Sequence, residues 1–388
     1  MIHHGNALEV LRTMESESVD ACVTDPPYEL GFMGKSWDRQ GVAFKVELWA
    51  EVLRVLKPGA HLLAFGGTRT FHRMVCAIED ADFEIRDTIA WLYGSGFPKS
   101  LDVTKAIDKH LGDTRPVVGS MDTNTAMRGG KFAAGSVRRP REVDVTSPGS
   151  AQSAQSAQWQ GYGTALKPAL EPICVARKPL AGTVATNVLE HGTGALNIDA
   201  CRIQGEAGDG VWGSSNKGCQ DGRTFNGSPT GEEYRSQAHE LGRWPANVVH
   251  DGSDEVLAAF PETQSGKPCG SNFAGGNPVT GFGDSGSAAR FFYCAKASAD
   301  ERPSVLIDGK TLQHPTVKPE SLMAWLVQLV CPEGGLVLDP FAGSGTTLAV
   351  AKKLGRRWVG IELNAEYIEL ANERLAGVTP SLFLEAAS

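Results

Sequence analysis

The tetrapeptide Asp25-Pro26-Pro27-Tyr28 combines residue types that could hold a flat heterocycle carrying an amino group. The Asp25 carboxylate and the Pro26 carbonyl can both accept hydrogen bonds from a single NH2 group, and the Tyr28 ring offers a surface for stacking. The two prolines restrict the backbone, so these groups would be presented stiffly. A strand-ending turn with a tyrosine packed in the core could have the same sequence, and the tetrapeptide alone leaves both interpretations open.

A second stretch, Leu338–Thr347, has two glycines where a strand is expected to turn into a helix. Glycines let the backbone approach a ligand closely, and a helix N-terminus directs N–H groups at it. The dinucleotide fingerprint fails because Leu348 replaces its third glycine, and a P-loop fails because no lysine precedes Thr346. A nucleoside-cofactor loop fits what remains, with Glu362 placed to accept hydrogen bonds from ribose hydroxyls. The alternative is a plain glycine-rich turn and a surface glutamate.

Together the two stretches resemble the amino-methyltransferases of DNA, which methylate the exocyclic nitrogen of adenine or cytosine. That family has (D/N/S)-P-P-(Y/F/W) as its catalytic motif and F-x-G-x-G as its cofactor loop, which correspond here to Asp25–Tyr28 and Phe341–Gly345. The resemblance implies S-adenosylmethionine as the cofactor, double-stranded DNA as the substrate, and Asp25, Pro26, Pro27 and Tyr28 as the catalytic residues. The motif order is that of the family's β group. It implies an α/β fold with a Rossmann-like methyltransferase sheet, a circularly permuted motif order and an inserted loop-rich target-recognition region.

Two further stretches resemble cofactor-contacting segments of the family. His314–Pro319 resembles the segment that lines the methionine end of the cofactor, and His4–Ala7 resembles the segment that contacts its adenine. The family usually has Asp where this chain has Asn6, and an amide can still form a hydrogen bond. The cofactor contacts implied by the resemblance are Asn6, Asp25, His314, Thr316, Lys318, Asp339, Phe341, Ala342, Gly343, Ser344, Gly345, Thr346, Thr347 and Glu362.

The implied mechanism is direct methyl transfer to a base flipped out of the duplex. Asp25 and Pro26 would hold the amino group and draw its lone pair out of conjugation, while Tyr28 stacks on the base. Within the family, Asp in the first motif position goes more often with N6-adenine, so we favour adenine. N4-cytosine is the main alternative, and an RNA or small-molecule N-methyltransferase, or a DNA-binding protein without catalysis, are weaker ones. The long loop-rich middle favours a polymeric target.

A cytosine C5-methyltransferase would need a Pro-Cys nucleophile, and Pro268-Cys269 is present. It lies in the glycine-rich middle, without the following Gln typical of that class, and we reject this interpretation. The other cysteines form no C-x-x-C pair and the histidines form no H-E-x-x-H motif, so no metal site is expected.

Alternating strands and helices at both ends of the chain predict parallel β-α units. In the N-terminal part we expect strands at 19–24, 61–65 and 83–91, with helices at 49–56 and 70–80. In the C-terminal part we expect strands at 336–338 and 358–361, and helices after Pro319, through 348–354 and from Asn364 to about 375. Both motifs would then follow the carboxyl ends of parallel strands and frame one crevice.

The pattern divides the chain into four parts. Residues 1–111 and 311–376 would form the catalytic domain, and 377–388 a tail. Residues 112–310 lose periodicity and would form an inserted region that recognises the target and contacts DNA.

The net charge of −8 argues against a protein that coats nucleic acid, but a local basic surface is compatible with it. Residues 114–141 contain six basic side chains and one acid, Asp122. A solvated basic loop is the alternative to a phosphate clamp there. Lys35 lies in a glycine-containing loop that could close over the base or the DNA backbone, and a surface loop with a partly buried Trp37 is the alternative. The predicted DNA contacts are Lys35, Arg128, Lys131, Arg138, Arg139 and Arg141.

The first 30 residues carry charges throughout and have no unbroken apolar core, so no signal peptide is expected. The most apolar window, 322–331, is too short to span a bilayer. These features predict a soluble cytoplasmic protein. A homodimer and a restriction endonuclease partner are compatible with the resemblance, and the sequence does not decide either.

Overall fold

The computed structural model describes residues 1–30, 41–96, 100–112, 153–203, 242–264, 285–295 and 317–379. It also gives the backbone of two short hairpins, β5 (Val117–Asp122) with β6 (Glu142–Thr146), and β12 (Ser304–Ile307) with β13 (Lys310–Gln313). The predicted DNA contacts Lys35, Arg128, Lys131, Arg138, Arg139 and Arg141, and the predicted cofactor contacts His314 and Thr316, lie outside the described residues.

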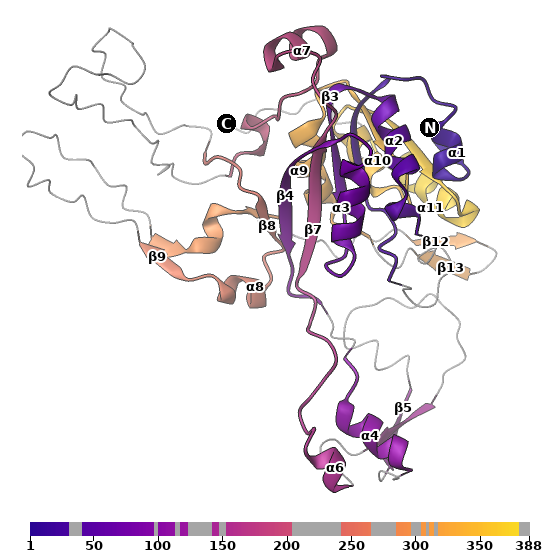
Figure 1. The fold of residues 1–388 in the computed structure, drawn as a ribbon, viewed down its shortest axis with the longest axis vertical. Coiled ribbons are helices and arrows are strands. Elements are labelled where there is room, and N and C mark those ends of the chain that lie inside the picture. The colour runs from indigo at the N-terminus through magenta and orange to yellow at the C-terminus, as the bar shows by residue number, and fades with distance from the viewer. Residues whose placement is uncertain are drawn as a thin grey trace, which may run out of the picture.

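A nine-stranded sheet forms the centre of the protein (Figure 1). Its strands, in spatial order, are β1 (Ile2–His4), β15 (Arg357–Glu362), β14 (Leu336–Asp339), β2 (Val19–Thr24), β3 (Leu56–Phe65), β7 (Leu170–Arg177), β4 (Glu84–Leu92), β8 (Val248–His250) and β11 (Tyr293–Cys294). Every neighbouring pair is parallel except the two that include β7. The predicted α/β architecture with a mostly parallel sheet is therefore confirmed.

Helices cover both faces of the sheet, and each face has its own core. One core contains side chains of α1 (Ala7–Leu11), α2 (Val46–Val55) and α3 (Phe71–Glu79), including the fully buried Trp49. The other contains side chains of α9 (Glu320–Val330) and α10 (Thr346–Lys353). Figure 1 shows α2 and α3 on one side of the strands and α9 on the other. Apolar residues at helical spacing produce these buried faces.

The expected elements at the two ends of the chain are confirmed with shifts of a few residues. The last helix, α11 (Ala365–Ala376), begins after Asn364, whose side chain accepts a hydrogen bond from the Glu366 N–H at 2.9 Å. The strand expected at 61–65 begins earlier, at Leu56, and includes Gly59. Gly59 has a φ of +75°, and a Cβ there would lie 2.4 Å from the Asn187 amide nitrogen, so the backbone requires glycine.

Residues 112–310 contribute three strands to the central sheet, β7, β8 and β11. The buried run 173–176 gives β7 the apolar composition of a strand covered on both faces. The sequence reasoning predicts no strand there.

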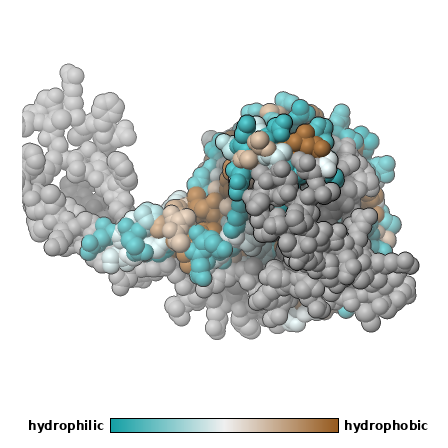
Figure 2. All heavy atoms as spheres, turned by 90° about the horizontal axis from the view of Figure 1, so that it is seen from below, coloured by the Kyte–Doolittle hydropathy of each residue, from teal (hydrophilic) through white to brown (hydrophobic). Residues whose placement is uncertain are grey.

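The remaining elements lie around the rim of the sheet. In Figure 1, α4 and α6 lie together below the sheet and α7 lies above it. These elements are α4 (Val103–Leu111), α6 (Ala154–Ala157), α7 (Val184–His191), α8 (Asp254–Ala259), β9 (Glu262–Gln264), β10 (Ser285–Ser287) and the 3-10 turns Val42–Phe44, Asp199–Cys201 and Ala288–Phe291. Seen from below, the coloured surface mixes hydrophilic residues with small apolar groups (Figure 2). Among the described helices, none has the length and apolar character needed to cross a membrane.

Candidate active site

The two motifs converge because their strands are neighbours. β14 lies between β2 and β15, and all three run parallel. Asp339, at the end of β14, and Asp25, directly after β2, therefore lie at the same edge of the sheet. Glu362, at the end of β15, is the register partner of His4 on β1, which brings Asn6 to this edge as well. Five strands, counting β3, therefore end at this edge, where the sequence predicts the crevice.

Asp339 joins the two motifs by hydrogen bonds. Its Oδ1 accepts one from the Thr24 hydroxyl at 2.7 Å and one from the Phe341 N–H at 3.1 Å. Its Oδ2 accepts one from the Thr347 hydroxyl at 2.6 Å. Burial raises the pKa of Asp339 to about 6, although these hydrogen bonds act in the opposite direction. Asp339 therefore fixes the cofactor loop to the strand that carries the catalytic motif.

Four side chains form what we call the Lys318 cluster: Asp25, Tyr28, Glu171 and Lys318. The Lys318 ammonium donates to Asp25 Oδ2 at 2.7 Å and to the Tyr28 hydroxyl at 3.0 Å, and it lies 3.2 Å from Glu171 Oε2. The Tyr28 hydroxyl donates in turn to Glu171 Oε2 at 3.0 Å. Lys318 Nζ also lies 4.8 Å from the centre of the Phe65 ring. The three polar contacts of Lys318 match the three hydrogens of an ammonium group.

The electrostatics of the Lys318 cluster are set by two carboxylates around one ammonium. Burial alone would lower the pKa of Lys318, but Asp25 and Glu171 outweigh it and raise that pKa above its usual value. Burial and the same two carboxylates raise the pKa of the Tyr28 phenol well above its usual range. Lys318 therefore stays charged and Tyr28 stays neutral at physiological pH.

One carboxylate oxygen of the Lys318 cluster is left over. Within the part of the chain that the structure describes, Asp25 Oδ1 is buried without a hydrogen-bond partner, whereas Oδ2 of the same group is held by Lys318. A buried acceptor without a donor costs free energy unless a ligand completes it. The free oxygen is thus suited to receive an N–H from a bound molecule.

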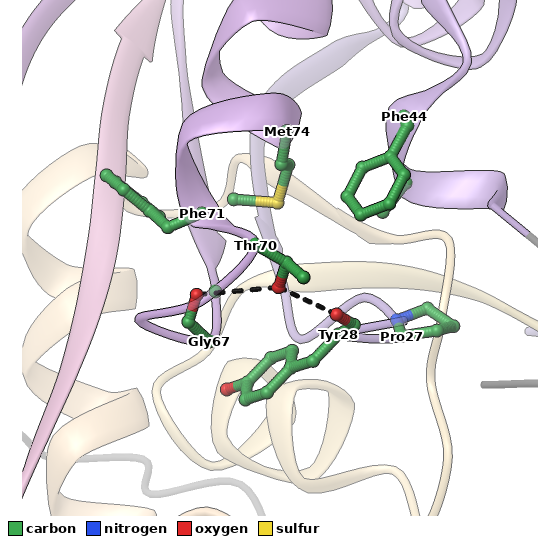
Figure 3. A pocket seen from close by; sticks show the side chains of 9 residues that line it. Pro27, Tyr28, Phe44, Gly67, Thr70, Phe71 and Met74 are labelled. Atoms are coloured by element: carbon green, nitrogen blue, oxygen red, sulfur yellow. Dashed lines mark hydrogen bonds between the residues drawn. The ribbon is translucent and has the colours of Figure 1, made fainter. Parts of the chain in front are cut away.

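A small apolar pocket lies behind the catalytic tetrapeptide, between Pro27, Tyr28, Phe44, Phe71 and Met74. In Figure 3 the Tyr28 ring points away from Phe44 and Met74. These two side chains therefore lie on the backbone side of the tetrapeptide and not against the face of the tyrosine ring.

Thr70, beside this pocket, donates its hydroxyl to the Tyr28 carbonyl at 2.7 Å, as Figure 3 shows. A Cβ on Gly67 would lie 3.2 Å from the Tyr28 ring, so glycine allows the close approach. The turn after β3 thus fixes the tyrosine from its backbone side.

Hydrogen bonds from its backbone N–H groups to β15 hold the predicted cofactor loop in place. The N–H of Ala342 donates to the Ile361 carbonyl at 2.9 Å, and that of Gly343 donates to Glu362 Oε2 at 2.8 Å. Gly345 has a φ of +75°, and a Cβ there would lie 2.8 Å from the Ala371 Cβ. The expectation that this loop offers N–H groups to a ligand is only partly met, because these N–H groups are used within the protein.

Glu362 and Asn6 have structural partners as well. Glu362 accepts one N–H on each oxygen, from Gly343 and from Asn364, both at 2.8 Å, and burial raises its pKa. The Leu363 N–H is a further donor to this carboxylate, which leaves about one lone pair to accept a ribose hydroxyl. Asn6 caps α1 by accepting the Leu8 N–H at 3.0 Å.

The structure brings most of the predicted site residues together at one edge of the sheet. Asp25, Pro26, Pro27 and Tyr28 lie beside Lys318, Asp339 and the cofactor loop 341–347. Lys318, a predicted cofactor contact, donates hydrogen bonds to Asp25 and Tyr28 of the predicted catalytic tetrapeptide.

Glu171 and Phe65 are site residues that the sequence reasoning missed. Phe65 is the last residue of β3 and Glu171 is the second residue of β7. A strand prediction for the apolar run 173–176 could have placed Glu171 near a strand end. Among the described residues, no group of three or more His, Cys, Asp or Glu side chains could hold a metal ion.

Comparison with known proteins finds two type II methyltransferases that are similar to one stretch of this chain. The chain is 51% identical over 63 residues to the type II methyltransferase M2.DpnII of Streptococcus pneumoniae, a match that covers 16% of this chain and 24% of that protein. It is 53% identical over 62 residues to the type II methyltransferase M.HpaI of Haemophilus parainfluenzae, which covers 16% and 20%. These alignments span less than a quarter of each relative's length.

Among solved structures, a putative DNA modification methylase of Thermus thermophilus, TTHA0409, aligns with a TM-score of 0.43 and 17% identity. That alignment covers 98% of this chain and 96% of that chain. The cytosine-N4-specific PvuII DNA methyltransferase aligns with a TM-score of 0.44 and 14% identity, covering 98% and 87%. The model of one family, the DNA methylases N6_N4_Mtase, matches residues 19–373, which include both motifs and the strands between them. The chain therefore belongs to the N6/N4 family of DNA methylases.

Proposed function

We propose that this chain methylates the exocyclic N6 of adenine in double-stranded DNA, using S-adenosylmethionine. The observation that carries the proposal is the buried Asp25 Oδ1, which has no hydrogen-bond partner among the described residues while Asp25 Oδ2 is held by Lys318. An amino group on a flat base supplies the missing N–H, and the neighbouring Pro26 carbonyl can accept the other hydrogen of the same group. Membership of the DNA methylase family supports DNA as the target.

The cofactor that the family uses fits the residues at the adjacent strand ends. Glu362 retains about one lone pair for a ribose hydroxyl, and Gly343 and Gly345, both at positive φ, add no side chains to the loop. When bound, S-adenosylmethionine supplies a methyl group made electrophilic by its positively charged sulfur.

Asp25 would act on the target nitrogen through its free oxygen. A hydrogen bond from the amino group to Oδ1 turns the nitrogen lone pair away from the ring, so the lone pair can form the new N–C bond as the S–C bond breaks. One amino hydrogen is released as a proton, through Asp25, to solvent. The Tyr28 ring would stack on the base and offset part of the few kcal/mol that flipping costs. Holding the two reacting centres in line supplies much of the acceleration.

Adenine is favoured over cytosine by Asp25, because Asp in the first motif position goes more often with N6-adenine within the family. N4-cytosine is the second candidate, since both bases present an amino group to the same acceptors. The predicted basic DNA contacts around 128–141, the permuted motif order, the inserted region, a homodimer, a restriction endonuclease partner and a cytoplasmic location stay predictions.

The test is to incubate unmethylated DNA of mixed sequence with the protein and S-adenosylmethionine labelled in its methyl group, then to digest the DNA and identify the labelled nucleoside. We expect N6-methyladenine. Labelled 4-methylcytosine would overturn the adenine assignment, and an unlabelled digest would overturn the proposed activity. The D25A variant should lose methyl transfer while it still binds S-adenosylmethionine in calorimetry, because Asp25 would contact the target amino group.

A further inference from the structure

Glu171 reaches the active-site edge because β7 runs against its neighbours. β7 is antiparallel to both β3 and β4, so its first residues lie beside the last residues of those strands. Glu171 is the register partner of Trp91, and Phe65 is the register partner of Ile173. Cross-strand partners project from the same face of a sheet. Glu171 therefore stands on the face that carries Phe65 and Trp91, where Lys318 also packs.

The Glu171 carboxylate contacts two groups of the Lys318 cluster. Its Oε2 accepts the Tyr28 hydroxyl at 3.0 Å and lies 3.2 Å from the Lys318 ammonium. The Glu171 side chain is 20% exposed and the Lys318 side chain 9%, so the pair is only weakly screened by water. Burial, together with the nearby Glu171 carboxylate, raises the pKa of Tyr93 to about 12; Tyr93 directly follows β4.

Charge balance shows what Glu171 contributes. With both carboxylates present, the Lys318 ammonium divides its hydrogens between Asp25 Oδ2, Glu171 Oε2 and the Tyr28 hydroxyl. If Glu171 were uncharged, Asp25 would be the one carboxylate of the cluster left to Lys318. The ammonium could then shift toward Asp25 and bind both of its oxygens, including Oδ1. The Tyr28 hydroxyl would also lose its charged acceptor, and hydrogen bonds to charged groups are about twice as strong as neutral ones.

We propose that Glu171 is a positioning residue for methyl transfer. It shares Lys318 with Asp25 and fixes the Tyr28 hydroxyl, and so keeps Asp25 Oδ1 available to the amino group of the target base. This inference rests on the proposed function. Glu171 itself touches neither the base nor the cofactor; it acts through Lys318 and Tyr28.

The experiment compares E171Q, which keeps the shape and removes the charge, with a matched control at the other end of the same strand pair. Glu84 on β4 pairs with Arg177 on β7, with Arg177 Nε donating to Glu84 Oε2 at 3.1 Å. E84Q therefore removes one carboxylate charge from the same ladder, away from the active site. For both variants we would measure kcat and KM for DNA, the Kd for S-adenosylmethionine, and the thermal midpoint.

We expect E171Q to lower kcat by about tenfold or more, since misplacing a reacting group by even ~1 Å can cost on the order of 100-fold. The KM for DNA and the Kd for S-adenosylmethionine should stay within about twofold, because no ground-state contact is removed. E171D, which keeps the charge on a shorter side chain, should recover part of the kcat. E84Q should keep the parental kcat.

A second readout follows Tyr28 without turnover. In protein labelled with tyrosine carrying 13C at the ring Cζ, the Tyr28 signal is assigned by its absence in Y28F. E171Q should shift this signal, because the phenol loses its charged acceptor, and E84Q should leave it in place.

The outcomes separate the inference from the proposed function. If the parent protein does not methylate DNA, the proposed function fails and this inference fails with it. If the parent is active and E171Q keeps the parental kcat, or leaves the Tyr28 signal unmoved, the inference alone is overturned. It is also overturned if E171Q loses cofactor affinity or thermal midpoint in step with kcat, because Glu171 would then be a structural residue only.

Discussion

Replacing Lys318 by methionine should destabilise the protein, and the loss should shrink at low pH. Methionine fills a similar volume, but it leaves Asp25 and Glu171 facing each other without the ammonium between them. Removing one partner of a buried ion pair costs about 3–5 kcal/mol. The Asp25 and Glu171 side chains are 25% and 20% exposed, so water screens part of this, and we expect about 2–3 kcal/mol at pH 8.

The pH dependence follows from proton binding. In K318M two neighbouring carboxylates repel each other, and the folded state relieves the repulsion by taking up one proton as the pH falls. The folded variant then binds more protons than the unfolded chain, so its stability relative to the parent rises toward low pH. The difference in the free energy of unfolding should therefore be larger at pH 8 than at pH 5.

Urea unfolding followed by tryptophan fluorescence measures both quantities. K353M serves as the control, since Lys353 lies 3.9 Å from Glu320 with its side chain 63% exposed, and such a surface pair contributes about 0–1 kcal/mol. A K318M shift of the urea midpoint no larger than that of K353M at pH 8 would refute the role of the buried ammonium. A K318M shift that is the same at both pH values would also refute it, because the carboxylates would then not be the source of the loss.

Three other predictions concern the cofactor loop, the buried aspartate and the DNA contacts. G345A should lower the free energy of unfolding by about 1–3 kcal/mol and weaken cofactor binding in calorimetry. G355A is the control, because Gly355 has a φ of +71° and open space around it, so this variant should lose only the free energy that the positive φ costs. Equal losses in the two variants would refute the contact of residue 345 with Ala371. Burial raises the pKa of Asp339 from its ordinary 3.8 to about 6, so the folded protein binds a proton there more tightly than the unfolded chain does. The free energy of unfolding of the parent, relative to that of D339N, should therefore fall by roughly 3 kcal/mol as the pH rises from about 4 to about 6, and then level off. A difference between the two proteins that does not change with pH would contradict this. Each arginine within 128–141 that contacts a phosphate should contribute about 0.9 to the slope of log affinity against log salt, measured by fluorescence anisotropy on duplex DNA, and an arginine-to-alanine variant with the parental slope would exclude that side chain.

Local patterns predicted the elements that carry the two motifs. The helical face of α9 and the short apolar strands β2 and β14 depend on residues close together in the sequence, and their ends are marked by proline, glycine and capping residues. The same reasoning placed both motifs at strand carboxyl ends, which the strand order confirms.

The neighbours of those strands could not be predicted in the same way. β7 lies between β3 and β4, and its pairing with them depends on contacts between residues about a hundred positions apart. Nothing in the local composition of residues 170–177 states that they run antiparallel or that Glu171 ends up beside Asp25. The tertiary pairing decides this, and it turned a glutamate without a recognisable motif into a direct partner of Tyr28.

Lys318 lies in a segment that the sequence identified, but its contacts with Asp25 and Tyr28 could not be predicted from that segment. The sequence placed it with the cofactor, because it precedes the cofactor loop in a segment that resembles the family. In the structure its ammonium contacts the catalytic tetrapeptide at 2.7 Å from Asp25 Oδ2. One oxygen of Asp25 is held in this way, and the other is buried with no partner from the described residues, so the second oxygen is the one left to accept a hydrogen bond. A single free acceptor beside a proline carbonyl suits an NH2 group better than a hydroxyl or a carbonyl, because both of its hydrogens can be satisfied at once. The arrangement of Lys318, rather than the tetrapeptide alone, thus gives a physical reason for a target nitrogen.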